Sequence, residues 1–236
     1  MEIEIMNPGA FGSALVKLEP GETFVSEAGA MFRASANVDI DVTTRSRGGG
    51  GLLAGLKRMM GGESFFLSTY RATDGQPGEV GVAPTLQGEV YPIELDVERP
   101  NIVCSGGSYL ASESTVSLNT EYQGLARGLL GGESLFFIKA GADEPGEGGT
   151  VLLNAFGRIT AVDVEGELVV DTGHLVAFEE TMEYEITKTN AGWIKSALSG
   201  EGLVMHFMGR GRVWVQSHNP TDFGQRLGRR LPPRRG

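Results

Sequence analysis

The sequence predicts an all-β protein made of three tandem β units, and three observations lead to this. A ten-residue pattern occurs three times without a gap, and alternating apolar and polar residues precede it each time. The copies read AGLKRMMGGE at 54–63, GLARGLLGGE at 124–133 and GWIKSALSGE at 192–201. The chain also has 36 glycines among many short apolar runs, which is typical of sandwiches, barrels and prisms. Such units bury their apolar faces against one another, so we expect one body.

The alternating block in each unit predicts a strand with one solvent-facing side. It aligns on Gly29, Gly107 and Gly173, each followed two residues later by a large apolar side chain, Met31, Tyr109 or Leu175. Nine residues after each glycine a period of two begins. Its inward positions are Val38, Ile40 and Val42, then Val116, Leu118 and Thr120, then Met182, Tyr184 and Ile186.

After each ten-residue pattern the sequence predicts a hairpin. An apolar run comes first, at 65–67, 135–138 and 203–205. A stretch rich in turn residues follows, at 74–78, 143–149 and 209–211, and then a second short apolar strand at 80–82, 151–153 and 213–215. Two short strands around a turn are the usual signature of a β-hairpin.

Short helical insertions are expected before these hairpins. The segment 48–60 has an apolar face suited to a helical turn, and 124–130 and 193–198 are its shorter counterparts. Glycines on both sides argue against a long helix.

The predicted organisation is a single domain over 1–225, with three repeats at about 1–87, 88–156 and 157–225. If the copies share one structure, the stretches that begin near Phe24, Ile102 and Leu168 superpose. The remaining residues, 226–236, form an arginine-rich tail that we expect to be disordered, because proline and glycine accompany the charges.

Charge and composition exclude several classes of protein. The net charge is −10, and since the last eleven residues hold five arginines and no acid, residues 1–225 carry −15. A body this acidic repels phosphate backbones, which argues against nucleic acid as a partner. No signal peptide is visible, and no apolar run approaches the roughly 18 residues that span a bilayer. Cys104 is the only cysteine, so we expect a cytoplasmic protein without a disulfide.

The chain resembles the Altered Inheritance of Mitochondria 24 family over about residues 1–218. The motifs that carry the resemblance are SEAGAM at 26–31, GGESFF at 61–66 and GGES at 131–134. The resemblance implies a fold like that of the trp RNA-binding attenuation protein, with three β units around a pseudo-threefold axis. It does not imply that RNA or tryptophan binds, and it supplies no catalytic residues. Eukaryotic members are associated with mitochondrial membrane organisation.

The glutamates of the ten-residue pattern allow two interpretations. Glu63, Glu133 and Glu201 would be related by the pseudo-threefold axis, so their carboxylates could converge on a hard cation. In the alternative, which we favour, each accepts backbone N–H groups or pairs with the basic residue of its own copy. Those basic residues are Lys57, Arg127 and Lys195. We therefore assign no metal site and no cofactor.

No arrangement typical of an enzyme occurs in the sequence. The histidines lack metal-ligand spacing, and His206 lies in an apolar run where a packed, hydrogen-bonded imidazole is expected. The glycine-rich segment before Lys57 lacks the Gly-Lys-Ser/Thr order of a phosphate-binding loop, and no nucleophile elbow is present. Cys104 is expected to be a small buried hydrophobe.

The strongest candidate site is an apolar patch with a basic rim in the segment 48–60. Its residues are Leu52, Leu53, Leu56, Lys57, Arg58, Met59 and Met60. If exposed, it suits a partner protein or an anionic membrane surface; in the alternative it packs on its own sheet or on a neighbouring subunit. The arginine tail could likewise attract anionic lipid or RNA, or could be only a solubilising end.

The sequence thus predicts a non-enzymatic interaction or scaffold protein, cytoplasmic or peripheral at a membrane. We expect a homo-oligomer or a protein partner. The alternative is a module that binds a small ligand or RNA on the same fold.

Overall fold

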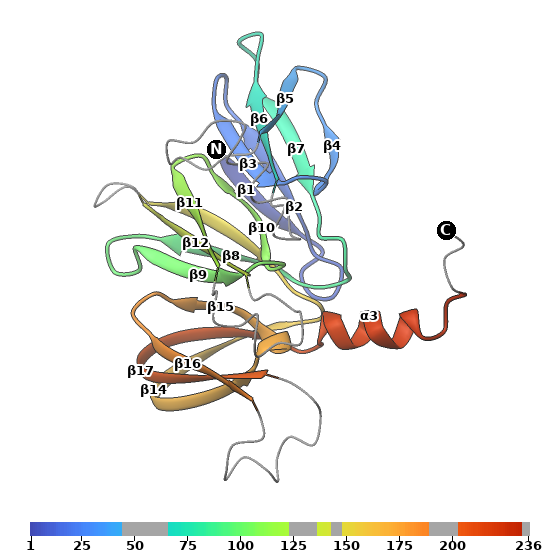
Figure 1. Ribbon diagram of the computed structural model, residues 1–236. Coiled ribbons are helices and arrows are strands. Elements are labelled where there is room, and N and C mark those ends of the chain that lie inside the picture. The colour runs from blue at the N-terminus through green and yellow to red at the C-terminus, as the bar shows by residue number, and fades with distance from the viewer. Residues whose placement is uncertain (44–65, 123–135, 143–147, 189–202, 233–236) are drawn as a thin grey trace.

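The computed structural model describes residues 1–43, 66–122, 136–142, 148–188 and 203–232, and strands occupy most of them (Figure 1). We call residues 1–87 unit 1, 88–156 unit 2 and 157–225 unit 3. Unit 1 holds β1 (Glu2–Met6), β2 (Ser13–Leu18), β3 (Thr23–Glu27), β4 (Met31–Ala34), β5 (Val38–Thr43), β6 (Leu67–Ala72) and β7 (Gly78–Val82). Unit 2 holds β8 (Val90–Leu95), β9 (Asn101–Ser105), β10 (Tyr109–Glu113), β11 (Val116–Tyr122), β12 (Phe136–Ala142) and β13 (Gly149–Asn154).

Unit 3 uses fewer and longer strands. They are β14 (Ile159–Asp171), β15 (Leu175–Glu179), β16 (Glu183–Lys188) and β17 (Leu203–Gln216). A short 3-10 turn, η1 (Thr172–His174), precedes β15, and the α-helix α3 (Pro220–Gly228) follows β17. The predicted all-β class is confirmed, with one short α-helix in the described part of the chain.

The strands form three curled sheets, and two of them combine strands from successive units. One sheet has the order β1-β2-β7-β4, all from unit 1. The second runs β5-β6-β3-β10-β13-β8, and the third runs β11-β12-β9-β15-β17-β14 with β16 paired to β17. In Figure 1 the units follow one another from the blue N-terminal end, through the green middle, to the orange and red C-terminal end.

One pairing scheme recurs in the three units. In each, an early strand pairs antiparallel with the strand that follows the ten-residue pattern, and the pairs Phe24↔Tyr70, Ile102↔Ala140 and Leu168↔Phe207 stand at matching places in the three ladders. A register shift also recurs, at Met31/Arg33, Tyr109/Ala111 and Leu175/Ala177. The residues that begin these shifts are the large apolar ones that follow the aligned glycines, so the anchors chosen from the sequence mark a β-bulge.

Successive units are held together by antiparallel strand pairing, at two places that we call joints. In the first joint β3 of unit 1 pairs with β10 of unit 2, through Ser26↔Ala111, Val25↔Ser112 and Phe24↔Glu113. In the second joint β9 of unit 2 pairs with β15 of unit 3, through Cys104↔Ala177, Val103↔Phe178 and Ile102↔Glu179. The two joints have the same register relative to the bulges.

Three apolar clusters form the core, and each draws on a neighbouring unit. The cluster of unit 1 includes Leu110, Ala111 and Leu152 of unit 2. The cluster of unit 2 includes Val176, Ala177 and Trp214 of unit 3. The third cluster gathers Phe178, Phe207 and Met205 of unit 3 with Val103 and Phe137 of unit 2. Since burial of apolar surface is the main driving force of folding, these shared clusters couple the units.

The predicted hairpins are wrong. Strands β6 and β7 are neighbours in the chain but lie in different sheets, and β12 and β13 are likewise separated. The turn residues Asp74 and Gly75, at φ values of 59° and 66°, lie between β6 and β7, where the chain crosses from one sheet to another. Turn chemistry shows that the chain changes direction but not whether the next strand pairs with the previous one.

In unit 3 the expected turn at 209–211 is absent, because β17 continues through it. Gly209 faces Gly166 of β14, and the two have φ values of +107° and +114°. Positive φ is open to glycine at little cost, so the paired glycines let one continuous ribbon bend where units 1 and 2 interrupt their strands.

Three expectations are not decided by the fold. The helical insertions lie in residues outside the described ranges. The pseudo-threefold axis and the likeness to the trp RNA-binding attenuation protein stay predictions.

Among the described residues, no helix is long and apolar enough to span a membrane.

Candidate interaction surfaces

The residues singled out in the sequence lie outside the part of the chain that the structure describes. They are Leu52, Leu53, Leu56, Lys57, Arg58, Met59, Met60 and Glu63 in 44–65, Arg127 and Glu133 in 123–135, and Lys195 and Glu201 in 189–202. Their roles stay predictions. Among the described residues, we consider three surfaces where apolar side chains are exposed beside charged ones.

The first surface is the free edge formed by β4. Phe32 in its bulge is 56% exposed, whereas Leu110 and Val176, at the matching places of β10 and β15, are 1% and 0% exposed. Strands β10 and β15 are covered by the preceding unit, and β4 pairs only with β7 among the described strands. The difference in burial follows from the missing neighbour.

Arg33, the next residue of β4, lies across Gly81 of β7. A Cβ atom at Gly81 would come within 2.6 Å of Phe32 Cζ and 3.0 Å of Arg33 Cγ, so both side chains occupy the space above this glycine. The Arg33 guanidinium Nη1 donates to Glu79 Oε2 at 3.1 Å. A charged pair therefore borders this edge of the sheet.

The second surface is on β5, which ends immediately before residues 44–65. Ile40 and Val42 share a face with buried Val38 and were expected to point inward, but they are 43% and 62% exposed, so that expectation is wrong for these two residues. Asp39 and Asp41 alternate with them, so the strand shows apolar and acidic groups to solvent. Two exposed apolar side chains on one face of a strand are a small apolar patch, which makes this face a candidate contact surface.

The third surface is helix α3. Asn219 caps its N-terminus, since its side-chain oxygen accepts the backbone N–H groups of Thr221 and Asp222 at 2.9 and 3.2 Å. Pro220 occupies the first helical position, where its missing N–H costs nothing. The Phe223 ring packs 5.0 Å from the ring of Phe156, at the end of unit 2, which fixes the base of the helix to the β body.

Beyond its base, α3 extends away from the sheets into solvent (Figure 1). Phe223 and Leu227, four residues apart and hence on one face, are 42% and 46% exposed, and Leu231 beyond the helix is also exposed. Arg226, Arg229 and Arg230 are exposed beside them. The first three residues of the predicted tail, 226–228, are thus helical.

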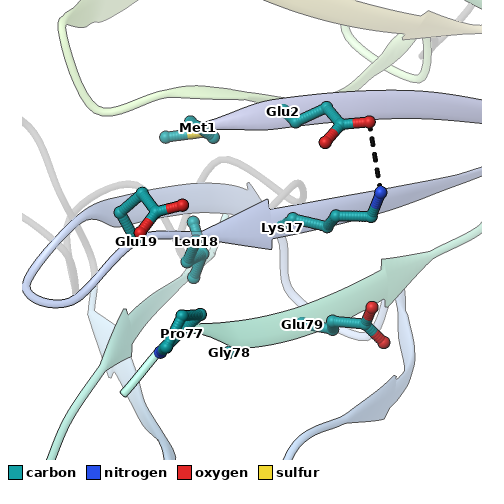
Figure 2. Close-up of a pocket in the computed structure, with 8 residues that line it drawn as sticks. All are labelled: Met1, Glu2, Lys17, Leu18, Glu19, Pro77, Gly78 and Glu79. Carbon is teal, nitrogen blue, oxygen red and sulfur yellow. Dashed lines mark hydrogen bonds and ion pairs between the residues drawn. The ribbon is translucent and has the colours of Figure 1, made fainter. Parts of the chain in front are cut away.

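A shallow cleft of about 410 Å³ lies at the N-terminal edge of unit 1, lined by Met1, Glu2, Lys17, Leu18, Glu19, Pro77, Gly78 and Glu79. Figure 2 shows Lys17 and Glu2 facing one another across β2 and β1, with 3.1 Å between Nζ and Oε1. The terminal ammonium of Met1 donates to Glu22 Oε1 at 2.8 Å, which lowers the pKa of the Glu22 carboxyl. Lys17 and the terminal ammonium are therefore each paired with a carboxylate at this cleft.

The described residues contain no group of three or more His, Cys, Asp or Glu that could hold a metal ion. Cys104 is fully buried, and burial raises the pKa of its thiol to about 12, so it remains a protonated, packed side chain as expected. His206 is half-buried, with Nε2 3.4 Å from Glu167 Oε2. Its Nε2 makes no hydrogen bond, contrary to the expectation for a packed imidazole.

Two of these surfaces were missed in the sequence, although signals for both were present. The Asn219-Pro220 pair followed by Phe223 and Leu227 is a helix start with an apolar stripe, but the arginines drew the interpretation towards disorder. The β4 edge could have been found by comparing the aligned positions, where Arg33 stands against two alanines, Ala111 and Ala177.

Comparison with known proteins identifies the family. A 31% identical protein of Streptococcus pyogenes serotype M6, M6_Spy0233, is described as uncharacterized, and the match covers 92% of this chain and 86% of that protein. The crystal structure of protein SPYM3_0169 from Streptococcus pyogenes is similar with a TM-score of 0.76 and 28% identity, over 98% of this chain and 99% of that one. The profile of the family described as mitochondrial biogenesis AIM24 matches residues 3–218. The resemblance stated from the motifs is confirmed: this chain belongs to the AIM24 family.

Proposed function

We propose that this protein is a non-enzymatic interaction or scaffold protein that docks peripherally on an anionic membrane surface through α3. The observation that supports this most is the exposed apolar face of Phe223 and Leu227 on a helix whose base is fixed by Phe156. Helix α3 itself carries one basic residue, Arg226, and one acidic residue, Asp222, and the other four arginines follow it in the sequence. An apolar helix face next to a run of arginines suits an interfacial anchor, with the apolar residues in the acyl boundary and the cations at the headgroups.

The distribution of charge supports the same orientation. The five arginines after residue 225 oppose an acidic body, and each contributes on the order of 1 kcal/mol near an anionic bilayer. Because α3 extends away from the sheets, its cations can reach the headgroups while the acidic sheets stay at a distance.

A protein partner or a second copy belongs to the same proposal, and we assign it to the face of β5 that carries Ile40 and Val42. Ile40 and Val42 are exposed there, and β5 leads into the segment that holds the predicted patch. The alternative function, a module that binds a small ligand or RNA, has weaker support, since arginines alone would serve RNA and would not need exposed Phe223 and Leu227.

The test is flotation with vesicles of phosphatidylglycerol and phosphatidylcholine, against vesicles of phosphatidylcholine alone. The full chain is expected to float only with the anionic vesicles, and less so at high salt. Leu227→Asp should reduce the bound fraction several-fold, because it puts a carboxylate on the apolar face. Gln225→Asp adds the same charge to the opposite side of the same helix and should reduce it much less.

Three results would contradict the proposal. Equal losses from Leu227→Asp and Gln225→Asp would show that only net charge matters. Loss of binding in Met59→Asp/Met60→Asp, with Leu227→Asp unaffected, would move the anchor to the segment 48–60. No flotation together with nucleic acid retained on the purified protein, seen as a raised ratio of absorbance at 260 and 280 nm, would favour the alternative.

A further inference from the structure

Each of the two sheets that combine successive units consists of three strands from one unit and three strands from the next. Each end of the chain has three strands that fit this scheme but lack the other three. Each composite sheet joins a leading half, β5-β6-β3 or β11-β12-β9, to a following half, β10-β13-β8 or β15-β17-β14. By the same scheme, and among the described strands, β4-β7-β2 is a following half without a leading one, and β16-β17-β14 is a leading half without a following one. The backbone for a third joint is thus present, split between the two ends of the molecule.

The two joints share a cross-strand pair that packs into the preceding unit. In the first joint Ala111 pairs with Leu152, and in the second Ala177 pairs with Trp214. All four side chains are buried, in the cluster of the preceding unit. Both joints therefore have an alanine on the strand that pairs with the preceding unit and a large apolar residue opposite it on the next strand of the same sheet.

The β4 edge reverses this arrangement. The matching pair is Arg33↔Gly81, with the large and charged residue on the joint strand and no side chain behind it. Phe32 and Arg33 fill the space above Gly81, and Arg33 is paired with Glu79. In unit 1 the side chains of Phe32 and Arg33 therefore lie over their own sheet, whereas the matching side chains of β10 and β15 are buried in the preceding unit.

We propose that β4 is a blocked joint: its backbone fits the free edge of β14 in a second copy of this chain, and Arg33 with Phe32 keeps that copy away. The register of the two joints fixes how the strands would meet, with Val170 opposite Arg33 and Val169 opposite Ala34 of the other copy. Val170 and its neighbour Met205 are buried and apolar, so the guanidinium would lose water and the carboxylate of Glu79 without gaining a partner.

The physical reason for such a block is the open edge itself. Unpaired strand edges invite addition of further chains, and a charged side chain on the edge is a common protection. In repeat proteins the terminal repeat likewise needs a polar outer face to remain soluble. A head-to-tail contact of this kind would otherwise extend into rings or filaments. Arg33 thus limits the series of joined units to the three of one chain.

The inference is independent of membrane docking, and its test is done in solution without vesicles. The triple variant Phe32→Leu/Arg33→Ala/Gly81→Leu gives β4 and β7 the trio Leu110, Ala111 and Leu152 of the first joint. It is expected to self-associate, with a mass by light scattering at least twofold above that of the unmodified chain at the same concentration. Arg33→Ala alone should associate more weakly, and Arg33→Lys, which keeps a charge on the edge, should match the unmodified chain.

Disulfide cross-linking checks the register. Chains carrying Ala34→Cys are mixed with chains carrying Val169→Cys under oxidation, and native Cys104, being buried, does not compete. The yield of cross-linked dimer should be about tenfold higher when both chains also carry the triple substitution than when they carry only the cysteine substitutions. Val97→Cys, exposed on the loop between β8 and β9 and outside both strands of the proposed contact, replaces Val169→Cys as the control and should give no increase.

Two results would overturn the proposal that β4 is a blocked joint. Ready cross-linking between Ala34→Cys and Val169→Cys in the otherwise unmodified background would overturn the inference, because the edge would not be blocked. Triple and Arg33→Ala variants that keep the circular dichroism of the folded chain and do not associate would overturn it as well. If the triple variant does not fold, the comparison of Arg33→Ala with Arg33→Lys decides.

Discussion

The two joints of this molecule use the same backbone pairing but different side chains to hold it. Among the described residues no ion pair crosses the first joint, which has the half-buried carboxyl of Glu27 at the end of β3. The second adds an ion pair between Arg99 Nε and Glu179 Oε1 at 2.9 Å, another between Lys139 and Glu180, and the Arg99 guanidinium 5.9 Å from the ring centre of Trp214. The same strand pairing therefore determines where the units meet, and the side chains determine how much each joint contributes to stability.

The largest expected effect comes from the large residue behind each joint. Trp214→Ala should lower the free energy of unfolding by about 4 kcal/mol and Leu152→Ala by about 3 kcal/mol, since both leave a cavity in a shared cluster. Urea unfolding followed by circular dichroism measures both. A smaller loss for Trp214→Ala than for Leu152→Ala would show that the second joint does not depend on the larger side chain.

A smaller effect is expected from the ion pair of the second joint. Arg99 and Glu179 are mostly buried, and Glu179 Oε2 also accepts the backbone N–H of Arg212 at 3.1 Å, so the carboxylate is held in place. A double-mutant cycle of Arg99→Ala and Glu179→Ala should give a coupling free energy of about 1 kcal/mol.

The pair of Lys139 and Glu180 is the control for this cycle, because its cation is as buried as Arg99 but its carboxylate side chain is 40% exposed, against 22% for Glu179. Its coupling free energy should be smaller than that of Arg99 and Glu179. Equal couplings for the two pairs would mean that burial and the contact with Trp214 add nothing.

The smallest effect concerns Glu27 of the first joint. Burial raises the pKa of its carboxyl above the ordinary value, because the ionised form loses hydration. The stability linked to this group is complete below the pKa of the unfolded chain and is lost as pH rises through the folded pKa. Glu27→Gln, neutral at every pH, should therefore raise the unfolding free energy at pH 7 and change it little at pH 4.

Exposed Glu98→Gln serves as the control, with little change expected at either pH. A loss of stability at pH 7 in Glu27→Gln would show that the ionised carboxyl is favourable where it lies.

Much of the strand framework could be predicted from the sequence, because alternation and the aligned glycines are local signals. Val38 and Val116 begin strands that the alternating pattern places correctly, and Met31, Tyr109 and Leu175 mark the recurring bulge. Sheet membership could not be predicted. The turn at Asp74 and Gly75 indicates only that the chain bends, and whether β7 pairs with β6 depends on strands far away in the sequence.

The candidate surfaces were harder to predict from the sequence, because they depend on residues that differ between the three repeats and not on residues that the repeats share. Arg33 matters only when compared with Ala111 and Ala177, and helix α3 has no counterpart among the described residues of units 1 and 2. The patch at 52–60 was chosen for its apolar and basic composition, which does not show which neighbours cover it. It stays a prediction.

The bend at Gly166 and Gly209 has a consequence for how this chain can change over evolution. Where unit 3 turns its ribbon with two glycines, units 1 and 2 carry loops between separate strands, such as 96–100 after β8. The same corner therefore accepts anything from no extra residues to a full loop without disturbing the ladders on either side. Insertions gained or lost by descendants should accumulate at these corners, and a foreign peptide grafted there is the addition that the architecture tolerates best.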